Sequence, residues 1–593
     1  MTRAVRGVRW RSVMLVAALA TLLAGCAAPS QPPLPWQARG HVPLPDAQQI
    51  MRVSLPGGQI DGHVFDPIHE VGTNLAGSLM VPLLYSGLFT MDTHLRPVPA
   101  LASGYSVSAD GLRYTFHLRS GARFSDGAAI TSSDAAFSLD RAAGPCDSYV
   151  SFDFGALKDA PRYAQESCAV NPHTPPTISA GPSGQPIIST LIGDALLTPD
   201  PRTLIVVLSR PDATLLDKLA EPYSGIVERS IVLRYGGYWT QHLADQGGQG
   251  TSGMYMPSAP MSDGANGQRI TLTRAKTYWG AQPRLREVVI DLRAPDQLTS
   301  GDVVFDGPGG FKQQTTGGPL KWRQAPARHE YYLTLDPAAP GLSDLRLRQA
   351  LALALDKTAL AADIGGQATN HLVPPGTGAY PATLSGPIAT APLTGNEAQA
   401  RTLWQSYVRD RCGGDASRCP PVTFYLGDWL LNPQVGQLAV SARWTSVLPG
   451  LRVTVTDPPD VLMTAPWYPW SAATPFNWYE DFPDPQDWLS TFVREPWTYT
   501  SSNTPSYTPS PVHDSAADAL VARAEAIPDP ATRLALYQQA ENTLLNDALV
   551  IPIAQQQVVW GVAPTVANFP ANPAPWIPPN AWARIDLTTT PGA

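Results

Sequence analysis

The segment from residue 467 to residue 499 combines aromatic rings with carboxylates. Aromatic side chains give a binding pocket a large contact area at a small cost in side-chain entropy. A carboxylate beside them neutralises an ammonium group that enters a closed, dry cleft, because an unpaired buried charge is very costly. This segment is therefore the first candidate for a ligand site. It holds five of the 16 tryptophans of the chain, namely Trp467, Trp470, Trp478, Trp488 and Trp497.

The first 25 residues have the pattern of a secretory signal. An almost wholly apolar run from residue 13 to residue 24 follows a basic start that contains no acid. This run is too short to cross a bilayer as a mature helix. It ends in LAGC, which resembles the bacterial lipobox, whose cysteine is acylated and becomes the new N-terminus; here that residue is Cys26. The alternative is an ordinary signal peptide with a chance cysteine. The basic residues are Arg3, Arg6, Arg9 and Arg11.

Residues 26–50 are predicted to be a lipidated, proline-rich tether. The stretch AAPSQPPLP after the lipobox cannot form a packed core. Two or more acyl chains, such as palmitate, hold a protein on a membrane, whereas one chain is marginal. The N-terminal region contains no pair of adjacent arginines, so a twin-arginine export route is not expected. We therefore expect an extracytoplasmic protein that is anchored to the cell membrane through Cys26.

Four further cysteines form two local pairs in the sequence. An exported protein meets an oxidising environment, so disulfides between Cys146 and Cys168 and between Cys412 and Cys419 are expected. A zinc site is the alternative, but the second pair lacks a nearby Cys/His pair. Both disulfides are expected to hold loops and to carry no chemistry.

Composition excludes several functions. The net charge is -8 and no basic stripe occurs, which argues against a nucleic-acid partner. There is no G-x-S-x-G, H-E-x-x-H or phosphate-loop motif, and the ten histidines are scattered, so neither an enzyme nor a resident metal or cofactor is predicted. With 593 residues the chain is long enough for two or three lobes.

Helices and strands alternate along the chain, which indicates an α/β protein. Asp110-Gly111 marks a hairpin turn, and Thr131 or Ser132 is suited to cap a helix. Asp529 can cap a helix that has Pro530 at its first position. Strands are expected over residues 115–124, 203–208 and 451–455, and helices over residues 344–360, 442–447 and 515–545, the last with a break at 528–530.

An ordered series of short motifs resembles one known family over nearly the whole mature chain. The family is the extracytoplasmic solute-binding protein family 5, which includes the oligopeptide-, dipeptide- and nickel-binding proteins of ABC importers. The block from 110 to 127 is the most specific part, and Ser86 stands where the family usually has an acid. The motifs are FDP at 65–67, LYSGL at 84–88, PVPALA at 97–102, DGLRYTFHLRSGARFSDG at 110–127, GTSGMY at 250–255, YWG at 278–280 and SDLRLRQAL at 343–351.

The resemblance implies a two-lobed periplasmic-binding-protein fold of the cluster C type, with an additional subdomain in the first lobe. The implied organisation is a signal peptide with lipobox at 1–25, the tether at 26–50, a lobe I core at 51–90, 210–330 and 555–593, the extra subdomain at 91–209, and lobe II at 331–554.

Within the aromatic segment, residues 478–485 resemble the W-x-x-D-x-x-x-P stretch of the family. In peptide-binding members the Asp of this motif accepts the α-ammonium of the ligand, and the matching residue is Asp481. The resemblance also implies that a strand containing Asn477 and Tyr479 pairs with the ligand backbone. Trp478 is expected to be a pocket wall or part of the core, and Thr73 to touch the ligand backbone.

Other charged residues near this motif receive different expectations. Asp484 precedes a proline and is expected to form a turn. Glu480 alternates with Asp481 along the strand and is expected to point away from the site. Arg123 and Arg443 are candidates for the ligand carboxylate by residue type alone.

The resemblance implies a lipid-anchored, monomeric receptor that captures short peptides in a closing cleft and delivers them to an ABC transporter permease. Other solutes of this fold are an oligosaccharide, a haem or a nickel complex. A sensor or cell-envelope assembly role on the same fold is a further alternative.

Overall fold

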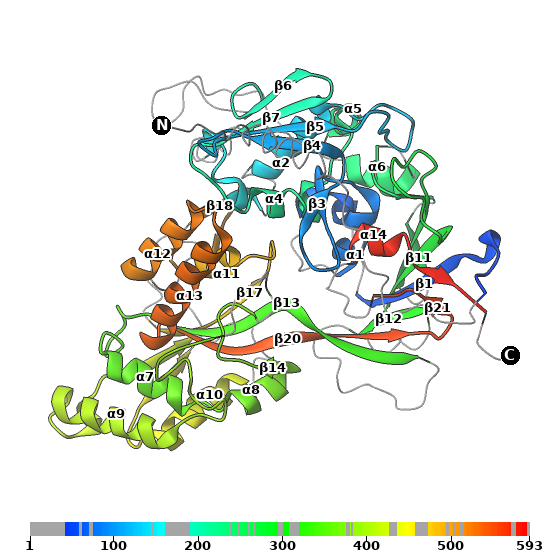
Figure 1. Ribbon diagram of the computed structural model, residues 1–593. Helices are drawn as coiled ribbons and strands as arrows, with labels where there is room; N and C mark the ends of the chain where they lie inside the picture. Colours follow the sequence, from blue (N-terminus) through cyan, green and yellow to red (C-terminus); the bar gives the residue numbers. More distant parts are fainter. Residues whose placement is uncertain are drawn as a thin grey trace, which may run out of the picture. The chain divides into compact units, whose positions relative to one another are not determined.

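The largest sheet joins segments that lie far apart in the chain. The structure is a computed structural model (Figure 1). Among the described residues, this sheet has 12 strands in the order β16-β15-β17-β13-β20-β12-β1-β11-β10-β8, with β14 paired to β20 and β9 paired to β10. The described residues are 42–57, 62–69, 75–144, 148, 150–160, 190–236, 239–246, 248, 250–258, 261–264, 267–293, 301–306, 320–374, 377, 380, 383–425, 436–456, 472–493, 497–501, 504–508, 512, 514–570 and 577–589.

Two long strands, β13 (Lys321–Leu335) and β20 (Val550–Val562), connect the two halves of this sheet. Residues 321–326 pair with residues 557–562, and residues 330–334 pair with residues 550–555. The register shifts between the two stretches, so residues 327–329 interrupt the regular pairing of β13 with β20. We call the half that contains β1 and β8–β12 lobe I, and the half that contains β14–β17 lobe II. The bounds are β1 Ile50–Pro56, β8 Tyr255–Pro257, β9 Ser262–Gly264, β10 Gly267–Arg274, β11 Glu287–Arg293, β12 Val303–Asp306, β14 Gly366–Ala368, β15 Val422–Tyr425, β16 Val453–Thr456 and β17 Ala473–Tyr479.

Lobe I buries an apolar core between its part of the sheet and three helices. β1 lies between β11 and β12 and is parallel to both. Its side chains Met51, Val53 and Leu55 are fully buried and pack with Leu79 and Trp582 from the helices. Burial of these side chains on folding is the main force that holds the lobe together. The helices are α1 Leu75–Leu84, α6 Trp239–Gln246 and α14 Pro579–Trp582.

A four-stranded sheet with its own core adds a subdomain to lobe I. Its β4–β5 hairpin turns at Gly111, where φ is 72° and glycine is favoured. Helix α2 begins with a capping box, in which Thr131 and Asp134 each accept from the backbone N–H of the other. The turn and the cap are both as predicted. The bounds are β4 Ala102–Val107, β5 Arg113–Leu118, β6 Leu196–Asp200, β7 Thr203–Val207 and α2 Ser132–Ala143.

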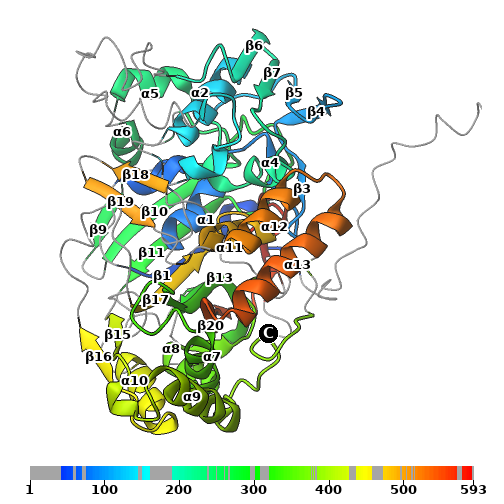
Figure 2. The same cartoon turned by 90° about the vertical axis from the view of Figure 1, so that its left-hand side faces the viewer.

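Helices cover both faces of the sheet in lobe II. Leu333 and Leu335 of β13 pack in one core, and Tyr332 between them packs in the other, because successive strand side chains point to opposite faces. Helices α11–α13 lie beside β17 in both views (Figures 1 and 2). The bounds are α7 Leu345–Ala354, α8 Lys357–Ile364, α9 Glu397–Arg411, α10 Gly436–Val447, α11 Pro485–Val493, α12 Ser515–Glu525 and α13 Pro530–Asn546.

The remaining described elements are short. Two of them, η4 (Ser151–Phe154) and η5 (Pro222–Ser224), carry residues of the site discussed below. The others are β2 Phe89–Met91, β3 Pro97–Pro99, β18 Trp497–Ser501, β19 Thr504–Thr508, β21 Val566–Ala567, β22 Asp586–Leu587, α4 Leu215–Lys218, α5 Arg229–Tyr235 and the 3-10 turns Asp46–Gln48, Gly62–Phe65, Pro67–His69 and Ala416–Arg418.

The helix predicted over residues 344–360 is two helices. Asp344 caps α7, but Leu355 leaves the helical region with ψ 139°, and Asp356 then caps α8. The prediction of one helix is wrong because a polar capping residue inside an apolar pattern competes with the helical backbone. The break at 528–530 is confirmed, with Asp529 as the cap and Pro530 as the first residue of α13.

One disulfide lies within the described residues. It joins Cys412 and Cys419, whose Cα atoms are 5.2 Å apart, at the end of α9. Cys26, Cys146 and Cys168 lie outside the described residues. Among the helices of the described residues, none has both the length and the apolar character needed to span a membrane.

Candidate ligand-binding site

Strand β17 places the predicted site residues on two opposite faces. Asn477 Oδ1 lies 3.2 Å from His329 Nε2, and the Tyr479 ring stacks on His329 with centroids 3.7 Å apart. Trp478 lies on the other face, where its Nε1 donates to Asp487 Oδ2 at 3.1 Å. The structure therefore brings Trp478 toward Asp481 and α11, whereas Asn477 and Tyr479 turn toward β13.

Among the described residues, one edge of β17 has no partner strand over most of its length. The strand pairs with β13 along all seven residues. On the other edge, Ala473 pairs with Phe424 of β15, and within the described ranges residues 474–479 have no partner strand there. An open edge presents backbone N–H and C=O groups that can pair with an added strand. This edge ends directly before Asp481.

Asp481 is buried in the turn between β17 and α11, with 8% of its surface exposed. Its backbone N–H donates to Asp487 Oδ2 at 3.1 Å. Burial raises the pKa of Asp481 well above its usual range, and the charges of Asp487, Asp153 and Glu221 raise this pKa further. Arg328 acts in the opposite direction. Asp481 is thus a carboxylate that binding of a cation would stabilise in its ionised form.

Three carboxylates from both lobes converge at this point. Asp153 of η4, Asp481 and Asp487 of α11 each offer one oxygen atom, and these atoms lie within 4.8 Å of one another. All three residues are buried. Burial raises the pKa of Asp487, and the charges of Asp153 and Glu480 raise it further. Such an oxygen group suits a hard metal ion or an ammonium group.

Arg328 connects the two lobes beside these carboxylates. It lies in the irregular stretch of β13. Its Nη2 donates to Glu221 Oε1 of lobe I at 3.2 Å, and its Nε donates to Glu480 Oε1 of lobe II at 2.5 Å. Burial raises the pKa of Glu221 to about 7 although Arg328 lowers it. We call Asp153, Glu221, Glu480, Asp481 and Asp487 the carboxylate cluster.

The expectation for Glu480 is wrong, and both candidate arginines have other hydrogen-bond partners in this structure. Glu480 does not point away, because its carboxylate binds Arg328 and accepts from Trp488 Nε1 at 3.1 Å. The candidate arginines are engaged elsewhere: Arg123 Nη1 donates to the backbone of its own loop, and Arg443 Nε donates to the backbone at the end of α7. Sequence reasoning missed Arg328, since no motif surrounds it.

Charged pairs with matched partners border the cluster. Lys218 binds Asp212 at 2.9 Å, and its ammonium lies 4.9 Å from the centroid of the Phe482 ring. Arg533 Nη1 binds both oxygens of Asp484 at 2.7 and 2.8 Å. Asp484 also accepts from a backbone N–H of α11, so it has the structural role that the Asp-Pro pair predicts.

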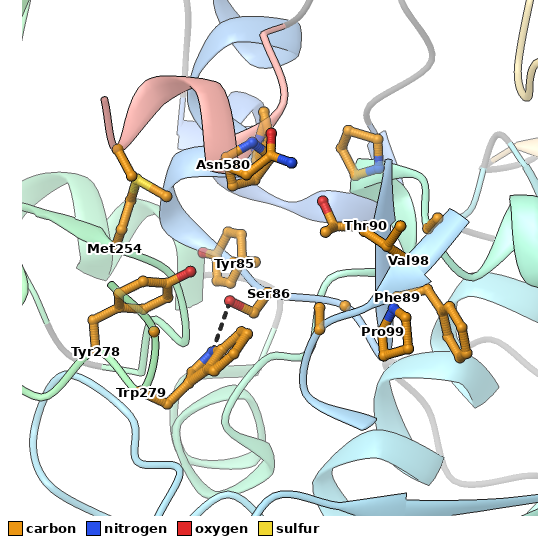
Figure 3. A pocket seen from close by; sticks show the side chains of 18 of the residues that line it. Tyr85, Ser86, Phe89, Thr90, Val98, Pro99, Met254, Tyr278, Trp279 and Asn580 are labelled. Atoms are coloured by element: carbon orange, nitrogen blue, oxygen red, sulfur yellow. Dashed lines mark hydrogen bonds between the residues drawn. The ribbon is translucent and has the colours of Figure 1, made fainter. Parts of the chain in front are cut away.

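Lobe I also holds a cavity of about 230 Å³ next to Ser86 (Figure 3). Ser86 Oγ accepts from Trp279 Nε1 at 3.2 Å and donates to the Ser252 carbonyl at 3.1 Å. The cavity is smaller than the roughly 300–1,000 Å³ of typical ligand pockets. Glu221 is the member of the carboxylate cluster that lines it. Its other walls include Tyr85, Phe89, Met254, Tyr278 and Asn580.

Thr73 and the tryptophans Trp467 and Trp470 lie outside the described residues. The described part of the predicted site therefore consists of β17, the turn with Asp481, and α11. Its chemistry is that of a cation site beside an open strand edge.

The chain belongs to the bacterial extracellular solute-binding proteins of family 5. Residues 96–500 match the family 5 middle region. The periplasmic oligopeptide-binding protein OppA of Escherichia coli K12 is 24% identical over 562 residues, which cover 92% of each chain. The "Probable deoxycholate-binding periplasmic protein YgiS" of the same strain is 25% identical over 551 residues, covering 89% of this chain and 92% of that protein. These relatives are named as binding proteins rather than enzymes.

Solved structures have the same two-lobed fold. The murein tripeptide-binding protein MppA of Escherichia coli superposes with a TM-score of 0.64 at 18% identity, covering 91% of this chain and 98% of that one. OppA of Haemophilus influenzae in complex with the peptide RPPGFSPFR superposes with a TM-score of 0.62 at 17% identity, covering 91% and 99%. The predicted family and fold are therefore confirmed, and the family is extracytoplasmic.

Proposed function

We propose that this protein is a membrane-anchored receptor that captures short peptides by their N-terminus and delivers them to an ABC transporter permease. The observation that carries the proposal is the position of Asp481 at the end of the open edge of β17. A carboxylate in this position neutralises an α-ammonium, and the strand edge pairs with the peptide backbone that follows it. The two features together match an extended peptide.

The charge of the site favours a cationic group over an anionic one. Asp481 and Asp487 are buried beside Asp153 and Glu221, so a ligand carboxylate placed there would meet like charges in a medium of low dielectric constant. A bile acid such as deoxycholate carries a carboxylate, and we do not propose it as the ligand of this cluster. A neutral sugar would leave the acids without a cation.

Both lobes contribute carboxylates to the site, which are close together in this structure. Asp153 and Glu221 come from lobe I, whereas Asp481 and Asp487 come from lobe II. A ligand ammonium that contacts both groups binds the closed form better than the open form, which is the condition for a ligand to shift the equilibrium toward closure. The closed form would then be the one that docks on the permease.

The experiment is calorimetry with a pool of tetrapeptides and with the same peptides acetylated at the N-terminus. Acetylation removes the ammonium and should abolish binding. Asp481→Asn keeps the shape of the side chain and should weaken binding of the free peptides by about 2–5 kcal/mol, as expected when a buried charge loses its partner. The matched control is Asp363→Asn, which removes an exposed carboxylate from α8 of the same lobe.

Equal affinity for free and acetylated peptides would show that the ammonium is not the recognised group. Native mass spectrometry of the purified protein gives an independent readout, because a co-purified sugar or metal complex in place of peptides would replace this proposal. The lipid anchor is tested separately with Cys26→Ser, which should move the protein from the detergent phase to the aqueous phase in a Triton X-114 partition.

A further inference from the structure

Asp487 gives the proposed peptide site a second carboxyl group next to Asp481. Its Oδ2 accepts from Trp478 Nε1 and from the backbone N–H of Asp481, both at 3.1 Å. These two donors are neutral, so they hold the carboxylate in place without neutralising it. Within the described residues, neither Asp481 nor Asp487 forms an ion pair.

The described cations around this pair are bound to other carboxylates. Arg328 binds Glu221 and Glu480, and Lys218 binds Asp212. A ligand with one ammonium would therefore neutralise one of two adjacent buried carboxylates. The second carboxylate would then have no cation and would have to stay protonated, because burial and the neighbouring acids raise its pKa, whereas a second ammonium would let it ionise.

Tyr223 adds an acceptor from the opposite lobe. It is 3% exposed, and among the described residues no group donates a hydrogen bond to its hydroxyl oxygen. Burial raises the pKa of Tyr223 well above 10, and the charges of Asp153, Glu221 and Asp481 raise it further, so this hydroxyl faces the carboxylate cluster. The phenol can donate to Asp153, but a carboxylate returns no proton, so the buried phenol oxygen still lacks a donor.

We propose that the site selects peptides whose first residue carries a second cation, such as a lysine or ornithine side chain. The α-ammonium binds Asp481, and the side-chain ammonium lies between Asp487 and the Tyr223 hydroxyl. Both positive charges are within one side-chain length of each other, as the two adjacent carboxylates require. This inference rests on the proposed function, because it assigns the peptide N-terminus to Asp481.

A divalent metal ion is the competing occupant. It would be held by Asp153, Asp481 and Asp487, whose oxygen atoms lie within 4.8 Å of one another. The surroundings favour an ammonium group instead, because the indole N–H of Trp478 and the phenol of Tyr223 border the pair. Hard metal ions prefer six or more oxygen ligands, which these neighbours do not supply.

The test compares two peptides that differ by one amino group, Lys-Ala-Ala-Ala and norleucine-Ala-Ala-Ala, by calorimetry in buffer with EDTA. The lysine peptide should bind about 10-fold more tightly or better, as expected for one additional desolvated charge pair. In Asp487→Asn, which keeps the shape of the side chain and one acceptor oxygen but removes the charge, this ratio should fall toward one. In Tyr223→Phe it should fall by a smaller factor, and in the control Asp194→Asn, an exposed acid of lobe I, it should be unchanged.

Equal binding of the two peptides would overturn this inference and leave the proposed function intact. Binding of neither peptide would overturn both. Calcium or manganese chloride that binds the protein without peptide, and no longer binds Asp487→Asn, would assign the acids to a metal ion and also overturn the inference. Tyr223→Phe keeps the test informative if Asp487→Asn does not fold, since the loss of one hydroxyl leaves the ring packing in place.

Discussion

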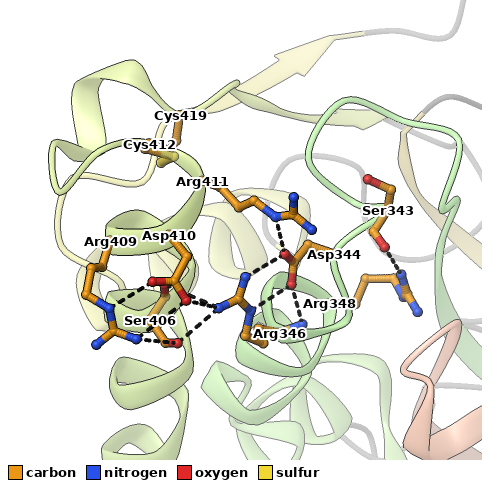
Figure 4. Close-up of polar contacts among 10 residues, drawn as sticks. All are labelled: Ser343, Asp344, Arg346, Arg348, Ser406, Arg409, Asp410, Arg411, Cys412 and Cys419. Carbon is orange, nitrogen blue, oxygen red and sulfur yellow. Dashed lines mark hydrogen bonds and ion pairs between the residues drawn. A yellow bond between two sulfur atoms is a disulfide. The ribbon is translucent and has the colours of Figure 1, made fainter.

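Two charged regions of this protein contain similar residue types, but the pKa values of their aspartates shift in opposite directions. The carboxylate cluster is buried between the lobes. The second region lies on the surface of lobe II between α7 and α9, where Asp344 binds Arg346 and Arg411 at 2.8 Å, and Arg346 also binds Asp410 at 2.6 Å (Figure 4). We call these four residues the α7–α9 network. Its arginines are 28% and 64% exposed.

The difference between the two regions lies in burial and in the balance of charge. Hydrogen bonds from Arg346 and Arg411 hold the pKa of Asp344 well below its usual range. Burial and neighbouring acids instead raise the pKa of Asp481. A pKa that is raised by burial and by like charges is typical of functional sites, whereas matched ion pairs at a surface are usually structural. The comparison therefore separates the proposed binding site from a network that holds two helices together.

The largest effect on stability is expected from Arg328→Met. The change leaves Glu221 and Glu480 buried without their guanidinium, and the free energy of unfolding should fall by about 3–5 kcal/mol at pH 8. Arg411→Met removes an exposed partner of Asp344 and should cost about 1 kcal/mol or less. Urea unfolding of both variants measures the two losses of unfolding free energy. Equal losses would show that the buried ion pairs of Arg328 contribute no more to stability than the exposed pair of Arg411.

An intermediate effect is expected from pH. The pKa of Glu221 is about 7 in the folded protein and near 4.5 in the unfolded chain. The folded state therefore keeps a proton that the unfolded state releases, and the resulting stabilisation, complete below pH 4.5, is lost as the pH rises toward 7. Between the two pKa values, the free energy of unfolding falls by about 1.4 kcal/mol per pH unit for one proton.

The measurement is urea unfolding of the ligand-free wild type and of Glu221→Gln at pH 5, 6 and 7. Wild type should lose about 1–3 kcal/mol relative to the variant over this range. Parallel curves would mean that Glu221 titrates normally. Asp344 has the opposite sign, since its lowered pKa gives stabilisation above its unfolded pKa that is lost on acidification.

A small effect, similar to that of Arg411→Met, is expected from Asp344→Ala. The change removes the cap of α7 and the carboxylate shared by Arg346 and Arg411, and it should cost about 1 kcal/mol of unfolding free energy. Peptide affinity should stay within a factor of about two, because the α7–α9 network has no member in the carboxylate cluster. A large loss of affinity in calorimetry would show that the two regions are coupled.

The sequence predicts local features well and the site only in part. The caps at Thr131 and Asp529 and the turn at Gly111 depend on residues within four positions of each other, so their patterns are readable. Asp481 is found through a motif. The interruption at Asp356 is missed because the apolar spacing continues across it.

The rest of the carboxylate cluster has no local signature. Asp153 and Glu221 lie on short turns of lobe I, and Arg328 lies in a long strand, more than 150 residues before Asp481 in the chain. Only the folded topology brings them together. A lone carboxylate on a turn is normally a surface residue, so its burial is not predictable from its neighbours in the sequence.

Strand β20 has a consequence for the order in which the chain folds. All 13 of its residues are buried, and it lies between β13 and β12 at the junction of the two halves of the sheet. A nascent chain that has reached residue 549 still lacks the strand that both lobes share. Neither lobe can reach its final packing before the last part of the chain is made, and such long-range pairing is slow. A truncation just before Val550 should therefore leave both lobes incomplete rather than one.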